Sequence, residues 1–338
     1  MKIVVDCHGN DKGASVAVQG GLLAMKKQND LSIVFCGKSQ EISSCLAGNS
    51  YDKNRVEIVD AQDVISNEES PTEGVKTKPE SSLVKAFEQL KTREDVAGLV
   101  SCGSTGAVLT AAFLKIGRIK GISRPGLCPV LPTKSGGQVL LIDSGANVDC
   151  KPINIAHFAI MGSSYAKAYF GVENPRVALL NIGTEDKKGN EFCHECFKLL
   201  KETPVNFVGN MEARDFLSGE YDVIVTDGFY GNILLKSVEG TSKFITSMLK
   251  DEIKSSLSGK IGALFMKKTF KNFKEKMNYN NYGGAAFLGI KKLIVKGHGA
   301  ADGTAFEKCI LQVYTLASKG LCQDIEKEIV EIGDKLNG

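Results

Sequence analysis

The chain lacks any long apolar run: none of its 338 residues lies in a segment that approaches the roughly 20 apolar residues of a transmembrane helix. It also lacks a strong charge of either sign, since its net charge is only +3. Nucleic-acid-binding domains usually carry a strongly basic stripe, so we expect no nucleic-acid partner. The first residues, MKIVVD, do not form the apolar core of a signal peptide. We therefore expect the ten cysteines to be reduced thiols in the cytoplasm.

Several nucleotide, hydrolase and metal motifs are also missing. The chain has no G-x-x-x-x-G-K-[ST] phosphate loop and no G-x-S-x-G elbow, which argues against an ordinary nucleotide site and a serine hydrolase. The G-H-G run at residues 297–299 is a poor dinucleotide fingerprint, because Asp302 stands where a third glycine is required. Cys193 and Cys196 have the spacing of one zinc-ligand pair, but no second pair accompanies them. We expect no metal site.

The chain does contain short apolar runs that alternate with helical patterns such as SSLVKAFEQLK. The runs are KIVVD, SIVFC, VEIVD, AGLVS, QVLLID, RVALLNI, VNFVG, DVIVT and LIVKG. Continuous apolar character suits strands buried on both faces of a mostly parallel, Rossmann-like sheet, and the alternation favours a doubly wound α/β fold. We predict a single three-layer α/β/α domain over residues 1–338, with residues 255–280 as its main elaboration.

Glycine together with Asp or Asn follows most of these runs. Turn chemistry explains each such turn equally well, because these residues favour turns for conformational reasons. However, ligands of open α/β sheets bind beyond the carboxyl ends of the strands, where all these turns are expected to meet. The loop GSTGAVLTAAF also leads into a helix, whose first N–H groups suit an anion. We predict a site for phosphate or another oxyanion.

Three of the four histidines and one cysteine have more than one interpretation. His298 and His8 fit a turn role as well as contact with an anion or proton transfer. His157 lies in a helical pattern, where packing is the preferred interpretation. Cys102 stands between a strand and a helix, where a lowered pKa would make a nucleophile, but we expect a buried small side chain.

The turns lie in blocks with a fixed order along nearly the whole chain. The blocks are VVDCHGND, SCGSTGAVLTAAFLKIGRIKGISRPGL, LIDSGANVDCKP, LLNIGTEDKKGNE, NFVGNMEARD, VTDGFYGNILLK, NYGGAAFLG and VKGHGAADG. In this order they resemble the bacterial phosphate acyltransferases of phospholipid synthesis, the PlsX family of acyl-[acyl-carrier-protein]:phosphate transacylases. Several collinear blocks are far more specific than one.

The resemblance implies an enzyme that makes acyl phosphate from inorganic phosphate and a long-chain acyl thioester of acyl carrier protein. The acyl phosphate then feeds a membrane glycerol-3-phosphate acyltransferase on the way to phosphatidic acid. The resemblance also implies a homodimer, with a fold like that of isocitrate and isopropylmalate dehydrogenases and phosphotransacetylases. Phosphate is already a nucleophile, so the protein has to position it, stabilise the tetrahedral oxyanion and help the thiolate leave. No cofactor is expected.

Site roles follow from this chemistry. We place phosphate near the backbone of residues 103–106 and near Lys188, while asparagines orient the thioester or its oxyanion. Asp227 or His298 protonates the departing sulfur, although hydrogen bonds that stabilise turns are the alternative for Asp227 and Asn232. The substrate-binding candidates are Asp6, Gly103, Ser104, Thr105, Gly106, Asn147, Asn181 and Asn210, and the catalytic candidates are Lys188, Asp227, Asn232 and His298.

A few positions depart from the family's usual pattern. Alanine has no hydroxyl, so phosphate contacts from the two serines that usually follow His-Gly are lost at residues 300 and 301. The departures are Cys7, His8 and Asn10 for Ala, Met and Gly, Ser104 for Asn, and Ala300 and Ala301 for Ser.

The segment GKIGALFMKKTFKNFKEKM, residues 259–277, mixes lysines with large apolar residues. Apolar residues before and after residue 266 fall on nearly opposite sides of one helix. We therefore predict a break near residues 265–267 and two short amphipathic helices, the first continuing from FITSMLKDEIKSSL. Periodicity alone prefers a hairpin packed on the sheet or across a dimer. The resemblance instead implies peripheral attachment to the anionic inner face of the cell membrane. The predicted contacts are Ile261, Leu264, Phe265, Lys267, Lys268 and Phe270.

Two other functions remain open. A phosphate transacylase that uses acyl-coenzyme A shares the fold and the chemistry. A membrane-associated acyl-binding scaffold has the same surfaces without turnover. A nicotinamide-dependent dehydrogenase is weaker, because no cofactor fingerprint is present.

Overall fold

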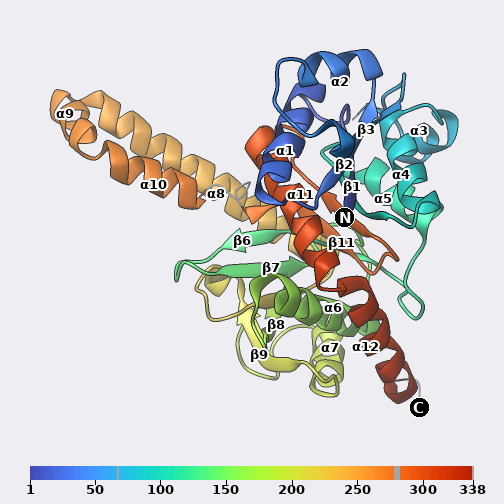
Figure 1. The fold of residues 1–338 in the computed structure, drawn as a ribbon. Helices are drawn as coiled ribbons and strands as arrows, with labels where there is room; N and C mark the ends of the chain where they lie inside the picture. Colours follow the sequence, from blue (N-terminus) through green and yellow to red (C-terminus); the bar gives the residue numbers. More distant parts are fainter. Residues whose placement is uncertain (67, 278–281, 337–338) are drawn as a thin grey trace.

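The computed structural model describes residues 1–66, 68–277 and 282–336. Its strands form two sheets, and a helical arm projects from the body that they build (Figure 1). The strands are β1 (Lys2–Asp6), β2 (Ser32–Gly37), β3 (Val56–Asp60), β4 (Val96–Ser101), β5 (Gly126–Cys128), β6 (Val130–Pro132), β7 (Gln138–Ile142), β8 (Arg176–Asn181), β9 (Asn206–Glu212), β10 (Val223–Val225), β11 (Ala285–Leu288) and β12 (Leu293–Lys296).

The helices lie between and after these strands. The α-helices of the body are α1 (Ala14–Lys27), α2 (Ser39–Leu46), α3 (Pro71–Thr77), α4 (Ser82–Thr92), α5 (Thr105–Ala111), α6 (Pro152–Tyr165), α7 (Glu191–Lys201), α11 (Gly303–Ser318) and α12 (Leu321–Leu336). Short 3-10 helices are η1 (Lys53–Arg55) and η4 (Ala213–Asp215), and α5 and α6 end in the π-helical turns η2 (Ala112–Ile116) and η3 (Ala166–Phe170).

The first sheet has the order β3-β2-β1-β4-β12-β11-β5. Its first five strands are parallel, and β11 is antiparallel to both of its neighbours. Successive residues of a strand face opposite sides of the sheet. Ile3 and Val5 therefore join the core formed with α1 and α11, while Val4 joins the core formed with α4 and α5.

The second sheet has the order β6-β7-β10-β8-β9, in which only β6 is antiparallel. Helices α6 and α7 cover one face, and their apolar residues merge with the core beneath α1 and α11. Phe216 and Leu234 cover the opposite face. Both sheets thus share one continuous core, although each has its own outer layer.

The predicted α/β fold class with mostly parallel strands is confirmed. All nine apolar runs are strands, and all nine are parallel to one another within their own sheets. The division into two sheets was not predicted, because nothing in a strand's own sequence names its neighbour. The short strands β5, β6 and β11 were also missed, since three or four residues carry no readable periodicity.

The arm consists of α8 (Gly228–Ser255), α9 (Leu257–Phe265) and α10 (Lys267–Met277) (Figure 1). The predicted break near residues 265–267 is confirmed. The prediction that the first short helix continues from FITSMLKDEIKSSL is wrong, because Ser256 adopts an extended conformation and its Oγ accepts a hydrogen bond from Gly259 N at 3.0 Å. Residues 278–280 of the predicted elaboration lie outside the described residues. In the described ranges, no helix has the length and apolar character to cross a bilayer.

Candidate active site

A cavity of about 360 Å³ lies where the carboxyl ends of strands from both sheets meet. The first sheet contributes residues after β4 and β12, and the second contributes residues after β7 together with the start of α8. Both polar and apolar residues line it. The polar lining residues include Thr105, Ser144, Asn232, Lys236, Glu239, Lys296 and His298, and the apolar ones include Leu109, Leu127, Pro129, Val130, Leu131, Leu235 and Ala285.

The loop after β4 brings Thr105 and Gly106 to the cavity at the start of α5. The first N–H groups of a helix have no partner within the helix, and the side chain of Ser104 does not cap this one. The backbone N–H groups at the start of α5 are therefore not engaged by a capping hydroxyl of Ser104. Such groups suit an oxyanion.

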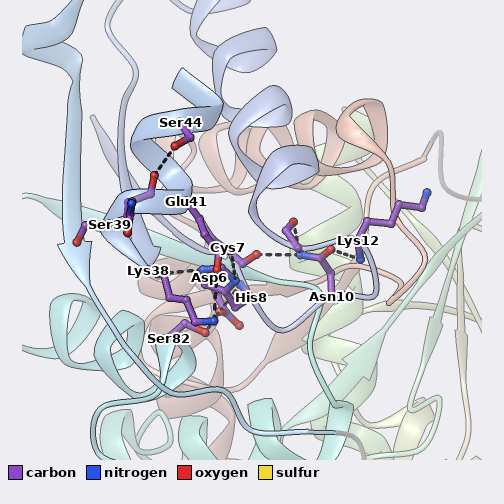
Figure 2. A network of polar contacts seen from close by, with 12 residues as sticks. Asp6, Cys7, His8, Asn10, Lys12, Lys38, Ser39, Glu41, Ser44 and Ser82 are labelled. Atoms are coloured by element: carbon purple, nitrogen blue, oxygen red, sulfur yellow. Dashed lines mark hydrogen bonds and ion pairs between the residues drawn. The ribbon is translucent and has the colours of Figure 1, made fainter. Parts of the chain in front are cut away.

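Asp6 lies beneath this loop rather than in the cavity wall. It is fully buried, and it accepts hydrogen bonds from Ser82 Oγ at 2.6 Å (Figure 2) and from Ser101 Oγ at 2.7 Å. Ser101 Oγ in turn accepts a hydrogen bond from Gly103 N at 3.1 Å. Asp6 therefore fixes the Gly103 loop through a chain of hydrogen bonds.

The other polar side chains of the turn after β1 form hydrogen bonds that stabilise the turn and its contact with the loop after β2 (Figure 2). Asn10 Nδ2 donates to Cys7 O at 3.0 Å, and Asn10 Oδ1 accepts from Lys12 N at 2.8 Å. His8 Nε2 accepts a hydrogen bond from Lys38 N at 2.9 Å. His8 is thus a turn residue that joins β1 to the loop after β2, and it does not line the cavity.

Close glycine contacts fix the start of α8 against the loop after β7. Gly228 N donates to Asn147 O at 2.8 Å, and a Cβ at Gly231 would overlap the carbonyl oxygen of Asp143. Gly145 has a φ of +134°, and a Cβ there would lie 2.7 Å from Asn232 Nδ2. These approaches seat Asn232 at the cavity.

Asp143 organises the loop after β7. Its carboxylate accepts hydrogen bonds from the backbone N–H groups of Leu127, Gly145, Ala146 and Asn147. Burial nevertheless raises its pKa. Sequence reasoning quoted this residue only as part of a turn, because the number of donors that converge on it depends on tertiary structure.

Asn147 and Asp227 hold the same region and do not line the cavity. Asn147 Nδ2 donates to Pro125 O at 2.7 Å and to Asp143 Oδ2 at 2.8 Å. Asp227 is the N-cap of α8, where Oδ1 accepts a hydrogen bond from Tyr230 N at 2.9 Å. Burial raises the pKa of Asp227.

Lys188, Asn181 and Asn210 gather around the loop after β8, away from the cavity-lining residues. Asn181 Nδ2 donates to Lys188 O at 3.0 Å, and Asn210 Nδ2 donates to Glu185 O at 2.8 Å. Asn210 lies within β9 and not in a turn after it, which corrects its predicted position. The Lys188 side chain is 49% exposed, with its Nζ 3.9 Å from Glu185 Oε1.

The cations of the cavity are residues that sequence reasoning did not select. Lys236 pairs with Glu239 at 2.9 Å, whereas Lys296, the last residue of β12, has no ion pair with any described carboxylate. Burial lowers the pKa of Lys296. The available signal was a lysine at the end of an otherwise apolar strand, directly before the G-H-G run.

His298 lines the cavity beside Lys296. Its Nδ1 accepts a hydrogen bond from Ala300 N at 3.2 Å, so the neutral ring carries its proton on Nε2. Burial, followed by the positive charge of Lys296, lowers the pKa of His298. The neutral ring is therefore the dominant form near pH 7.

A second hollow and the possible metal ligands were the other candidate sites. A more open hollow of about 490 Å³ lies between the starts of α1 and α2, but no predicted site residue lines it. Within the described ranges, no three His, Cys, Asp or Glu side chains group closely enough to hold a metal ion. His194 Nε2 donates a hydrogen bond to Lys187 O at 3.0 Å, and Cys196 is buried against the core.

Sequence relatives match nearly the whole chain. Residues 1–324 match the family model described as fatty acid synthesis protein. A phosphate acyltransferase of Clostridium tetani is 43% identical over 332 residues, which cover 98% of this chain and 99% of the relative. A phosphate acyltransferase of Bacillus cereus is 42% identical over 335 residues, which cover 98% and 100%.

Two solved structures share the fold at low sequence identity. A phosphotransacetylase of Streptococcus pyogenes superposes with a TM-score of 0.60 at 16% identity, over 94% of both chains. A branched-chain phosphotransacylase of Enterococcus faecalis gives a TM-score of 0.58 at 12% identity, over 94% of this chain and 99% of the other. The predicted likeness to the phosphotransacetylase fold is confirmed.

Proposed function

The chain belongs to the fatty acid synthesis protein family of phosphate acyltransferases, and we propose that it transfers a long-chain acyl group from acyl carrier protein to inorganic phosphate. The observation that carries this proposal is a cavity lined by both polar and apolar residues. Its lysines and polar side chains suit an oxyanion, while its apolar side chains suit hydrocarbon next to the reacting carbon.

The reaction needs no group beyond the two substrates. An oxygen of hydrogenphosphate attacks the thioester carbon, the C–S bond breaks, and the electron pair leaves with sulfur. The proton of hydrogenphosphate ends on that sulfur, which gives acyl phosphate and a free thiol. Asn232 lines the cavity, and in this proposal its amide donates a hydrogen bond to the oxyanion of the tetrahedral intermediate, where such donors contribute most.

His298 is the better placed of the two proposed proton carriers. It lines the cavity, whereas the Asp227 carboxylate caps α8 outside it. A neutral ring with its proton on Nε2 can donate a hydrogen bond to the departing sulfur, which stabilises the developing thiolate until the proton of hydrogenphosphate reaches it. Asp227 then acts by seating α8, which carries Asn232.

The direct test of this function is to measure the two products of the reaction. The protein is incubated with a long-chain acyl thioester of acyl carrier protein and phosphate, and acyl phosphate is trapped with hydroxylamine while the free carrier thiol is counted. We expect both products in equal amounts, and none when sulfate replaces phosphate. Product from acyl-coenzyme A alone would establish the coenzyme A transacylase, and absence of product from either donor would leave an acyl-binding scaffold.

The arm supports a membrane and dimer role. Leu264 and Phe265 are 73% and 87% exposed, and Lys267 and Lys268 lie beside them. Apolar side chains flanked by lysines suit insertion into an anionic membrane surface. Delivery at the inner face of the cell membrane places the acyl phosphate beside its proposed consumer, a membrane glycerol-3-phosphate acyltransferase.

A second copy of the chain fits the exposed apolar row on α8. Leu234 and Val238 pack into the body, and the same face continues along the helix to Ile245 and Leu249, which are exposed. The spacing of four, seven and four residues keeps this row on one side of the helix. Pairing of two such rows buries them in a homodimer, which sedimentation at several protein concentrations would reveal.

A further inference from the structure

The Lys296 side chain is partly buried and lines the cavity. In the first sheet it pairs in register with Ser101, so it stands at the carboxyl edge next to the loop that carries Thr105 and Gly106. Among the described residues, none forms an ion pair or hydrogen bond with its Nζ. A partly buried charge without a protein partner loses part of its hydration, and an anionic ligand can supply the opposite charge.

The groups around Lys296 do not neutralise it. Burial raises the pKa of the Cys102 and Cys309 thiols, so both are uncharged near pH 7. Glu239 is engaged by Lys236 at 2.9 Å. Asp11 acts on Lys296 only as a weaker, longer-range charge. The net charge of Lys296 and the groups around it is therefore positive.

Lys188 has a different environment. Its side chain is half exposed, its partner Glu185 offsets its charge, and it does not line the cavity. An exposed, paired lysine gives a small ligand little binding energy, because water screens it. The contrast favours Lys296 over Lys188 as the cation that meets an oxyanion in the cavity.

We propose that Lys296 binds the inorganic phosphate substrate and holds it for attack on the thioester. This assignment rests on the proposed function and names the residue of that site which takes the phosphate. The ammonium group contacts the phosphate oxygens that do not react, and it remains on them while the attacking oxygen forms its bond to carbon and the C–S bond breaks. It neutralises charge and orients the nucleophile without itself exchanging a proton.

The first test measures acyl-phosphate formation against phosphate concentration for Lys296→Met and Lys296→Arg. We expect Lys296→Met to raise the KM for phosphate roughly 10- to 100-fold, as for loss of a charged hydrogen bond. The KM for the acyl thioester should change less than about twofold, and Lys296→Arg should recover part of the loss. Lys291→Met, at the exposed approach to the same strand, should match the wild-type chain. An unchanged phosphate KM in Lys296→Met would overturn the assignment.

The second test needs neither turnover nor a variant. The wild-type chain is acetylated with limiting acetic anhydride, with and without phosphate, and the modified lysines are mapped by mass spectrometry. We expect phosphate, but not chloride at the same ionic strength, to slow acetylation of Lys296 and to leave Lys291 unchanged. Equal labelling of Lys296 under both conditions would refute the phosphate contact. Protection without acyl transfer from the carrier thioester would reject the proposed function and keep the phosphate site.

Discussion

The two ends of α8 have the same helical backbone in opposite surroundings. At the first end, Gly228, Gly231 and Leu234 are buried against the loop after β7 and the second sheet. At the far end, large apolar side chains such as Phe244 and Met248 are 64% and 57% exposed. Packing therefore specifies the first end, while the second end keeps an apolar surface that the body does not cover. One helix thus links the candidate cavity to the uncovered apolar surface of the arm.

The largest expected effect is a difference in stability between alanine substitutions at two glycines of α8. A Cβ at Gly231 would overlap Asp143 O, so Gly231→Ala should destabilise the fold by about 3 kcal/mol or more. Nothing lies within 4 Å of a Cβ at Gly240, so Gly240→Ala should stabilise by roughly 0.5–1 kcal/mol through helix propensity. Urea unfolding of both variants gives the comparison. Equal effects would show that the first end of α8 is not seated as described.

The next prediction concerns the far end of the arm. Changing Leu264, Phe265 and Phe270 to Glu should weaken binding to anionic liposomes at least roughly 100-fold, because three apolar side chains are lost from the lipid interface. The free energy of unfolding should change by less than about 1 kcal/mol. Val330→Glu, an exposed apolar position on α12, is the matched control and should bind liposomes normally. If the triple variant unfolds, the segment is core after all.

Two helix caps give a smaller contrast. Asp227→Ala removes the cap of α8 and should lower global stability by about 1 kcal/mol, whereas Asp227→Asn keeps the cap and should be close to wild type. Ser256→Ala removes the cap of α9. The free energy of global unfolding should hardly change, because none of the described residues of α9 is buried. Circular dichroism with urea measures both. Loss of catalysis in a stable Asp227→Asn variant would make Asp227 more than a cap.

The smallest expected effect is a change in the pKa of His298. Because the folded pKa of His298 lies below its ordinary value of about 6.5, the folded state disfavours the charged ring, and stability falls as pH drops from that value through the folded pKa. Nuclear magnetic resonance should place its midpoint below about 6.5. Lys296→Met should move the midpoint upward, because a neighbouring positive charge is removed. Lys254→Met on the arm should leave it unchanged, and a shift there would contradict the separation of the two ends.

Much of the fold was predictable from local sequence. The nine buried strands are continuous apolar runs, and parallel strands covered on both faces require that pattern. The break between α9 and α10 was predictable for a similar reason, because the apolar residues change face at Met266. The break at Ser256 was missed, since a serine in a helical pattern gives no sign of the extended conformation that makes it a cap.

The candidate site was predictable only in part. Thr105, Gly106, Asn232 and His298 line the cavity, whereas Lys188 lies on the surface beside the β8 loop. Lys296 was missed because a lysine as the last residue of a strand is common and gives no sign of a ligand site. Its significance comes from its position in the cavity and from the absence of a described counter-ion, and neither property is local to the chain.

By itself, the sequence determined the strands, the glycine-rich strand ends and the amphipathic character of the arm, because each depends on residues within a few positions of one another. The tertiary structure alone decided that the strands divide into two sheets, whose carboxyl ends enclose one cavity. It also decided which polar residues support that cavity and which face it. Burial, hydrogen-bond partners and the neutralisation of charge are set by residues distant in the chain, such as Asp6 and Ser101 or Lys296 and Thr105.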